Sequence, residues 1–335
     1  MAEDSYNPIR ALEYRHISGP TDEILEYIEE RRSGKLSSLK TRWDKFDKVS
    51  MGGIDWNTIF TIAGMSGCGK SSIANELETS LFDSNPEESF SVLSFNFEML
   101  AMKQIGRKIS SKVTKTVSEL YSAVVPLSDT DYDRAKEIAS YMSGKYDIYY
   151  VDIPGTVEEI YDTIRKFHAE QQELKGDDVG TVIFLDHTLL TKGNQRQSER
   201  ELLSKLYKMF MYAKKQMKCI FVALSQLNRE IESADRMSNP MIHYPMKKDI
   251  FGSDAVFHGS DYVLISHKPY MLNLQTYGSN NLPIVNPLNS QQAMVYWHLI
   301  KNRDGESGLV ISMVDNLKFN RIDEYYEPGK INFNI

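Results

Sequence analysis

The stretch that decides the fold is Gly64-Met65-Ser66-Gly67-Cys68-Gly69-Lys70-Ser71, and Ser72 follows it. It fits the pattern G-x-x-x-x-G-K-[ST], in which the glycines let backbone N–H groups close around phosphate oxygens. An apolar run from Ile59 to Ala63 precedes it and a helical pattern follows it, which is the context that this pattern requires. We therefore expect a phosphate-binding loop between a strand and a helix.

Two side chains of this loop have roles that follow from their chemistry. Lys70 would reach the β and γ phosphates of a nucleoside triphosphate, and the Ser71 hydroxyl would help to hold Mg²⁺. The backbone of residues 64–72 would surround the phosphates. The loop thus predicts binding and hydrolysis of ATP with Mg²⁺ as the cofactor.

Short apolar runs alternate with helical patterns on both sides of the loop. The runs that predict strands before residue 230 are 59–63, 90–97, 148–151, 182–185 and 219–224. The helical patterns between them lie around 102–109, through most of 110–146, from a capping box at Thr156 and Glu159 to about 172, and up to about 218. Parallel neighbours need crossover connections, so we expect an α/β fold with a mainly parallel sheet covered on both faces. Later strands at 262–266, 295–300 and 309–314 are closely spaced and predict an antiparallel edge.

Three polar side chains stand where predicted strands end near the loop. Asp186 closes one apolar run, where a carboxylate can coordinate Mg²⁺ directly or through water. Glu98 closes another, and it is the candidate general base that orients and deprotonates the attacking water. Gln226 follows a third, where it could sense hydrolysis beside the γ-phosphate. Without the loop, Glu98 would be interpreted as an ordinary acid at a helix start and Gln226 as a polar strand end.

The composition excludes several classes of protein. With 335 residues, 41% apolar and 25% charged, the chain is typical of a globular protein with one large or two modest domains. No run approaches the roughly 20 apolar residues of a membrane-spanning helix and no secretory signal begins the chain, so we expect a cytoplasmic protein with no membrane partner. The two cysteines, Cys68 and Cys219, lack the spacing of a zinc site or disulfide framework. A net charge of −7 argues against a basic coat but leaves room for a local basic channel around a single strand.

Apolar residues at helical spacing follow Thr21 and predict one short amphipathic helix that ends near Gly34. The helix can pack on its own domain or on a neighbouring subunit, and the sequence leaves both open. We divide the chain into an N-terminal extension with this helix, residues 1–34, and an ATPase domain, residues 35–335. The apolar positions of the helix are Ile24, Leu25 and Ile28.

The order of these elements resembles the C-terminal motor domain of DnaB-type replicative helicases, which are hexameric ring ATPases with a RecA-like core. The resemblance covers roughly residues 22–325. Where the family has a strand that ends Phe-Ser-Leu-Glu-Met, this chain has Phe95-Asn96-Phe97-Glu98-Met99, and its run from Val182 to Asp186 matches the family's apolar strand ending in Asp. The family's Ala-Leu-Ser-Gln-Leu-Asn-Arg is present intact at residues 223–229.

The resemblance implies further roles and partners. Lys301-Asn302-Arg303 resembles the family's Lys-x-Arg, so Arg303, with Lys301, is expected to stabilise charge on a phosphate bound by the adjacent subunit. A homo-oligomer in the form of a hexameric ring, a single-stranded DNA partner, and a loader, primase or other replication protein are implied in the same way. The helix near 22–33 resembles the family's linker helix, which packs on the next subunit. The family's N-terminal collar domain has no counterpart before it, and this favours a phage or mobile-element replication protein.

The chain departs from the family in its DNA-facing loop. The family's Asp-Leu-Arg-Glu-Ser-Gly corresponds to Asp249-Ile250-Phe251-Gly252-Ser253-Asp254, so Phe251 replaces the Arg. Binding of a strand would then depend on Lys247, Lys248, backbone N–H groups and stacking on Phe251. We expect loops near 193–200 and 245–254 to step along the strand, a mobile loop at 237–244, and a surface-exposed insert without assigned function at 275–291.

The leading functional expectation is an ATP-driven, ring-forming helicase that moves along single-stranded DNA during replication and excludes one strand of the duplex. Two alternatives share the same core. One is a RecA-like recombinase or strand-binding ATPase that forms filaments, and the other is an ATPase that switches protein partners without unwinding DNA. Phe251 and the acidic net charge keep the last alternative open.

Overall fold

The computed structural model describes residues 13–186, 188 and 198–327, and the chain divides into two compact units, residues 1–38 and 39–335. The first unit contains α1 (Ser18–Ser33). This helix begins at Ser18 and not after Thr21, because the Thr21 hydroxyl donates to the Ile17 carbonyl oxygen at 2.9 Å and so lies inside the first turn. Gly34, with a φ of 74°, ends the helix as expected.

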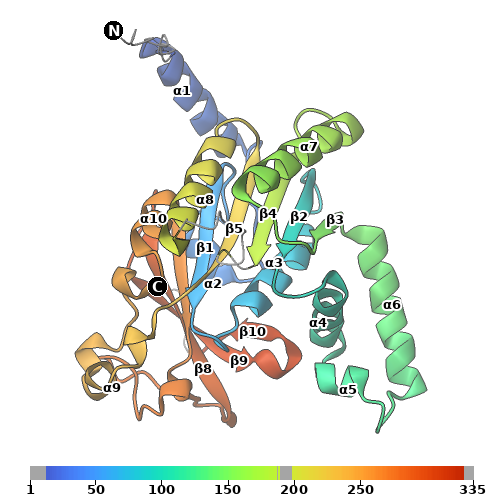
Figure 1. The fold of residues 1–335 in the computed structure, drawn as a ribbon, viewed down its shortest axis with the longest axis vertical. Helices are drawn as coiled ribbons and strands as arrows, with labels where there is room; N and C mark the ends of the chain where they lie inside the picture. Colours follow the sequence, from blue (N-terminus) through green and yellow to red (C-terminus); the bar gives the residue numbers. More distant parts are fainter. Residues whose placement is uncertain (1–12, 187, 189–197, 328–335) are drawn as a thin grey trace, which may run out of the picture. The chain divides into compact units, whose positions relative to one another are not determined.

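The second unit is built on one twisted sheet (Figure 1). Within the described residues its strand order is β10-β9-β8-β6-β1-β5-β4-β2-β3, and β7 pairs with β8. The strands from β6 to β3 are parallel, whereas β8, β9 and β10 join antiparallel to one edge, so both features expected of the sheet are confirmed. The strand bounds are β1 (Thr58–Gly64), β2 (Phe90–Asn96), β3 (Ile148–Val151), β4 (Gly180–Asp186), β5 (Cys219–Gln226), β6 (Tyr262–His267), β7 (Val285–Asn286), β8 (Asn289–Asn302), β9 (Leu309–Asn316) and β10 (Arg321–Glu324).

Helices cover both faces of the sheet. On one face, α7, α8 and α10 enclose a core in which Phe210 of α8 stacks on Phe221 of β5 with ring centroids 4.4 Å apart (Figure 1). On the other face, Phe46 of α2 stacks on Phe60 of β1 at 5.3 Å, and α3 buries Leu77 against the sheet. The helix bounds are α2 (Asp44–Val49), α3 (Lys70–Ser84), α4 (Ala101–Val113), α5 (Val117–Tyr121), α6 (Asp129–Lys145), α7 (Val157–Lys175), α8 (Glu199–Ala213), α9 (Ala234–Ser238) and α10 (Ser253–Gly259).

Two segments differ from their sequence predictions because buried side chains organise them. Residues 237–244, expected to be a mobile loop, contain the end of α9 and a short 3₁₀ turn. Arg236 anchors them through a buried bidentate ion pair with Asp249, with N–O distances of 2.9 and 3.0 Å.

The insert 275–291 is only partly at the surface. Tyr277 is fully buried, and its hydroxyl lies 2.6 Å from His267 Nδ1 and 2.7 Å from His298 Nε2. A polar composition hid this anchor, because one buried aromatic residue decides the placement of the whole segment. The strand β10 was also missed, and α8 ends at Ala213, earlier than the expected 218.

Gly180 begins β4, the strand that leads to Asp186, and it lies against the ring of Trp56. A Cβ atom added there would lie 2.1 Å from Trp56 Cη2, whereas one added at Gly144 in α6 meets nothing within 4 Å. We expect Gly180→Ala to destabilise the protein by about 1–3 kcal/mol through overpacking. Gly144→Ala, the matched control, should leave stability unchanged or raise it by up to about 1 kcal/mol. Urea unfolding measures both, and equal stability of the two variants would contradict the packing.

Candidate active site

The phosphate loop joins β1 to α3, as the sequence predicts. Gly67 and Gly69 have φ angles of 80° and 87°, a left-handed conformation that favours glycine. A Cβ atom on Gly69 would also lie 2.6 Å from Ile322 Cδ1, so the loop needs glycine there for packing as well. The loop ends at the N-terminus of α3, where unpaired backbone N–H groups and the helix dipole favour an anion.

Lys70 reaches back across the mouth of this loop. Its ammonium donates to the carbonyl oxygens of Gly64 and Met65, both at 2.9 Å. Burial lowers the pKa of Lys70, because the charged form loses hydration. A buried cation at a helix N-terminus is an arrangement that attracts phosphate.

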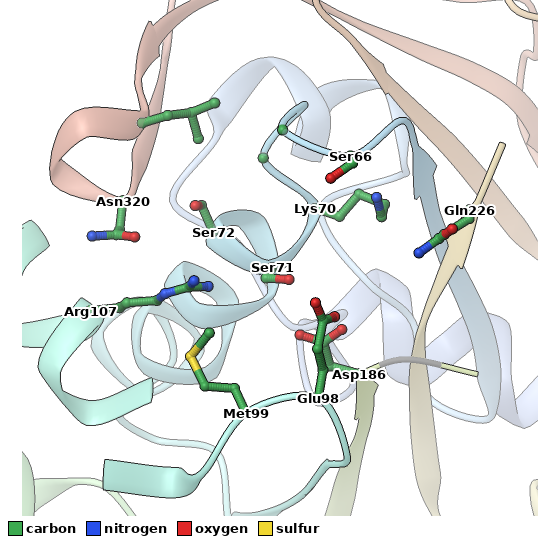
Figure 2. A pocket seen from close by; sticks show the side chains of 13 residues that line it. Ser66, Lys70, Ser71, Ser72, Glu98, Met99, Arg107, Asp186, Gln226 and Asn320 are labelled. Atoms are coloured by element: carbon green, nitrogen blue, oxygen red, sulfur yellow. The ribbon is translucent and has the colours of Figure 1, made fainter. Parts of the chain in front are cut away.

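Two carboxylates lie opposite the start of α3. Asp186 ends β4 in register with Asn96 of β2, and the Phe97 N–H donates to the Asp186 carbonyl oxygen at 2.9 Å, so Glu98 follows close by. Burial raises the pKa of Asp186 to about 6, and a hydrogen bond from Ser71 opposes this rise. Figure 2 shows Glu98 and Asp186 side by side next to Ser71. These oxygen donors around a buried carboxylate fit Mg²⁺, which prefers oxygen ligands.

Gln226 occupies the end of β5, in register with Gly64 of β1. Its side chain is exposed and lies beyond Lys70 from the two carboxylates (Figure 2). The Gln226 carbonyl oxygen accepts from the Phe251 N–H at 2.9 Å. The residue therefore lies between the phosphate loop and the segment expected to face DNA.

These residues share one cavity of about 280 Å³. Most of the predicted site lines it, but Gly64, Met65 and Cys68 do not. Gly64 and Met65 instead offer carbonyl oxygens to Lys70, and the buried Cys68 side chain packs on Met271, 3.9 Å between sulfur atoms. Burial raises the pKa of the Cys68 thiol, so the thiolate is disfavoured. The lining residues are Ser66, Gly67, Gly69, Lys70, Ser71, Ser72, Glu98, Met99, Arg107, Asp186, Gln226, Leu317 and Asn320.

Sequence reasoning missed four of these residues, and Arg107 matters most among them. Arg107 lies in α4, and Figure 2 shows it directed towards the side of the cavity that holds Ser71 and Ser72. Within the described residues its guanidinium makes no hydrogen bond or ion pair. A buried Lys108–Glu78 ion pair at 2.7 Å holds α4 against α3 and thereby places this free cation. The sequence carries no signal for it, because nothing in α4 shows which face looks into the cavity.

Lys301 and Arg303 are not brought to this cavity. They end β8 at the opposite edge of the sheet, where the Arg303 N–H donates to the Asp261 carbonyl oxygen at 3.0 Å and the Asp261 N–H to that of Ile59 at 2.8 Å. Five residues of β1 separate Ile59 from Gly64, a span of about 16 Å at the usual rise of a strand. Arg303 is therefore out of reach of the phosphate loop of its own chain.

The segment expected to face DNA lies beside a second cavity, which Asn228, Lys248 and Phe251 help to line. Phe251 is half-buried and packs against the main core, so its ring is less available for stacking than expected. Lys247 pairs with Asp254 at 3.1 Å. The other loop proposed to contact a strand, near 193–200, has residues 193–197 outside the described part of the chain.

The fold and the site together define a nucleotide-binding protein of the P-loop class with a RecA-like core. A family model described as the DnaB-like helicase C terminal domain matches residues 38–323. The chain belongs to this family and is a replicative helicase-type ATPase. No curated protein matches the chain. Among the described residues, no helix is long and apolar enough to cross a membrane.

Several solved structures share the fold. The ATPase domain of a phage helicase superposes with a TM-score of 0.75 at 17% identity, covering 94% of this chain and 100% of that one. A DnaB-like replicative helicase, solved with attention to its interactions with primase, gives 0.71 at 16% identity over 91% of this chain and 66% of that one. A KaiC-like protein of the hyperthermophilic archaeon Pyrococcus horikoshii OT3 gives 0.51 at 14% identity, over 87% and 100% of the two chains. At these identities the likeness concerns the fold alone.

We expect Arg107→Met to weaken nucleotide binding. A charge-assisted hydrogen bond to phosphate contributes about 1.5–3 kcal/mol, so the dissociation constant should rise by about 10- to 150-fold. Titration with a fluorescent nucleotide measures it. Arg165→Met, on the exposed side of α7 where Arg165 pairs only with Asp162, is the matched control and should bind normally. Unchanged binding by Arg107→Met would show that the cation does not meet the nucleotide.

Proposed function

We propose that this chain forms a ring that hydrolyses ATP and moves along single-stranded DNA, separating a duplex by excluding one strand. The observation that carries the proposal is the division of the catalytic residues between two edges of one sheet. The phosphate loop and carboxylates lie at one edge, and Lys301 and Arg303 at the other. A chain with this division completes its site only when a second copy supplies the missing arginine.

Within one subunit, each side chain of the cavity has a proposed task. Lys70 exchanges its two carbonyl partners for the β and γ phosphates of ATP. Ser71 and Asp186 would hold Mg²⁺, which when bound neutralises charge on the phosphates. Glu98, exposed at the cavity wall beside Asp186, orients the attacking water and accepts its proton. The low polarity around Asp186 strengthens each of these electrostatic contacts.

Arg303 of the adjacent subunit is the proposed group that stabilises charge on the transferring phosphoryl. Its side chain is 51% exposed, so it can reach outward. Lys301 differs, because its ammonium donates to the Phe257 carbonyl oxygen at 2.5 Å and lies over the Phe257 ring. Burial is the main cause that lowers the pKa of Lys301. We therefore assign the direct phosphate contact to Arg303 and a supporting role to Lys301.

Hydrolysis would be communicated to DNA through Gln226. Its backbone holds Phe251, and two residues later the Asn228 N–H donates to the Asp249 carbonyl oxygen at 2.7 Å. The Asn228 side chain also donates to the Lys248 carbonyl oxygen at 2.8 Å. A shift of Gln226 on loss of the γ-phosphate would thus move the segment bearing Lys247 and Lys248, whose ammonium groups can contact DNA phosphates.

The first unit fits a role in assembly. Ile24, Leu25 and Ile28 of α1 are 50%, 60% and 52% exposed, which is unusual for large aliphatic side chains at helical spacing. We propose that this stripe packs on a neighbouring subunit and ties the ring together. A loader or primase partner is proposed by analogy with the solved helicase that is described with its primase interactions.

One observation favours a second candidate, an ATPase that switches protein partners. Phe251 stands where the family has an arginine, and its ring is half-buried against the core. With a net charge of −7, this leaves fewer groups for DNA phosphates. The ATPase chemistry would be the same in both cases.

The discriminating experiment is ATP hydrolysis with Mg²⁺ in the presence and absence of single-stranded DNA. The helicase proposal expects DNA to stimulate turnover and expects a forked duplex to be unwound. Turnover that is indifferent to DNA, together with no DNA binding, would support the protein switch. Removal of Mg²⁺ with a chelator should abolish turnover in either case.

Mixing two inactive variants tests the composite site. Lys70→Ala should abolish turnover by removing the phosphate contact, and Arg303→Ala should lower kcat by about 10³- to 10⁵-fold while nucleotide binding persists. Rings assembled from both variants should regain part of the turnover, because intact loops of one variant then face intact arginines of the other. Mixed rings, verified by their mass, that show no recovery would refute an arginine acting between subunits.

A further inference from the structure

Asp261 lies where the chain enters β6, and its carboxylate is surrounded by donors from three separate elements. Its side chain is 4% exposed. Oδ1 accepts from Arg303 Nε at 2.6 Å, and Oδ2 accepts from the Ile59 N–H at 2.8 Å and from Lys214 Nζ at 2.6 Å. Asp261 thus joins the end of β8, the start of β1 and the end of α8.

The contact with Arg303 engages only one edge of the guanidinium. Nε is bound to Asp261, whereas the two terminal Nη groups make no hydrogen bond or ion pair within the described residues. The guanidinium is planar, so fixing Nε fixes the plane in which the other donors lie. These donors form a fork that suits two oxygens of a phosphate.

Other charges near Arg303 are each committed to a partner. Lys214 neutralises the far oxygen of Asp261, and Lys301 is bound to the Phe257 carbonyl oxygen at the end of α10. Arg303 is thereby left as the outward-facing donor of this group. A flexible exposed arginine would lose rotamer entropy when it binds a phosphate, and one held at Nε loses less.

We propose that Asp261 is a positioning residue that holds the Arg303 guanidinium by Nε and presents its two Nη groups to the nucleotide of the neighbouring subunit. The inference rests on the proposed role of Arg303 between subunits. It adds that this arginine is oriented before the partner arrives. The same carboxylate fixes the residue that follows α10, so a movement of the segment before α10 also reaches the arginine.

The test compares Asp261→Asn with Arg303→Ala and with the double variant, in steady-state ATP hydrolysis by the full-length ring. An asparagine amide would turn an N–H group towards the donors that Asp261 accepts from, so the grip on Arg303 is lost. We expect kcat to fall by up to about 100-fold, the reduction that a small misplacement of a catalytic group produces. KM for ATP should stay unchanged. In the Arg303→Ala background the Asp261→Asn change should lower kcat no further.

Controls separate positioning from folding. Asp147→Asn removes a half-buried carboxylate from Lys175 and Ser91 at the far edge of the sheet, so it makes the same change away from Arg303 and should keep full turnover. Arg303→Lys retains the charge but has no Nε group, and it should lose turnover almost as fully as Arg303→Ala. This variant carries the test if Asp261→Asn fails to fold.

The outcomes are distinct. Normal turnover by Arg303→Ala would overturn the proposed role of Arg303 and this inference together. Loss of turnover in Arg303→Ala with normal kcat in Asp261→Asn, or full activity in Arg303→Lys, would overturn the inference alone. A further fall in kcat when Asp261→Asn is added to Arg303→Ala would mean that Asp261 supports the fold and not the arginine.

Discussion

The parallel alignment of β1, β5, β4 and β2 is the constraint on which the rest of the molecule depends. Parallel strands in register deliver all their carboxyl ends to one edge, so Gly64 lies opposite Gln226, and Asn96 opposite Asp186. Each polar residue needs only to follow its strand by zero to two positions to reach the same cavity. The chemistry is thereby concentrated without any contact between the loops themselves.

The antiparallel edge has the opposite effect. Because β8 runs against β6, a residue at the end of β8 arrives at the edge where the parallel strands begin. Arg303 is placed there together with Asp261 and Lys214, an ion-pair group that the other edge does not need. The change of strand direction within one sheet therefore separates two groups of catalytic residues that the proposed reaction requires together.

Much of this organisation could be predicted from the sequence, because it depends on local patterns. The phosphate loop, the capping box at Thr156 and the apolar strands are written in short stretches, and each is present. Arg107, Asn320 and Tyr277 could not be predicted in the same way. Their roles depend on which neighbour faces them across hundreds of positions, as when Asn320 comes from a turn after β9 to line the cavity. The start of α1 was misjudged for a smaller reason, since a threonine hydroxyl can bond inside a helix as well as cap it.

The buried hydroxyl of Tyr277 has a consequence for the protons around it. A phenol has one hydrogen to donate, so of His267 and His298 one must accept it and the other must donate an N–H to its oxygen. His267 Nε2 has no partner among the described residues, and a bare lone pair there costs less than an unshared N–H. His267 therefore donates from Nδ1, and the phenol hydrogen points to His298. Burial lowers the pKa of both histidines, that of His267 to about 3, so the chain of protons is uncharged and runs in one direction. An attachment without charge neither weakens in salt nor titrates near neutral pH, and it keeps the 275–291 segment fastened under conditions that alter every ion pair around it.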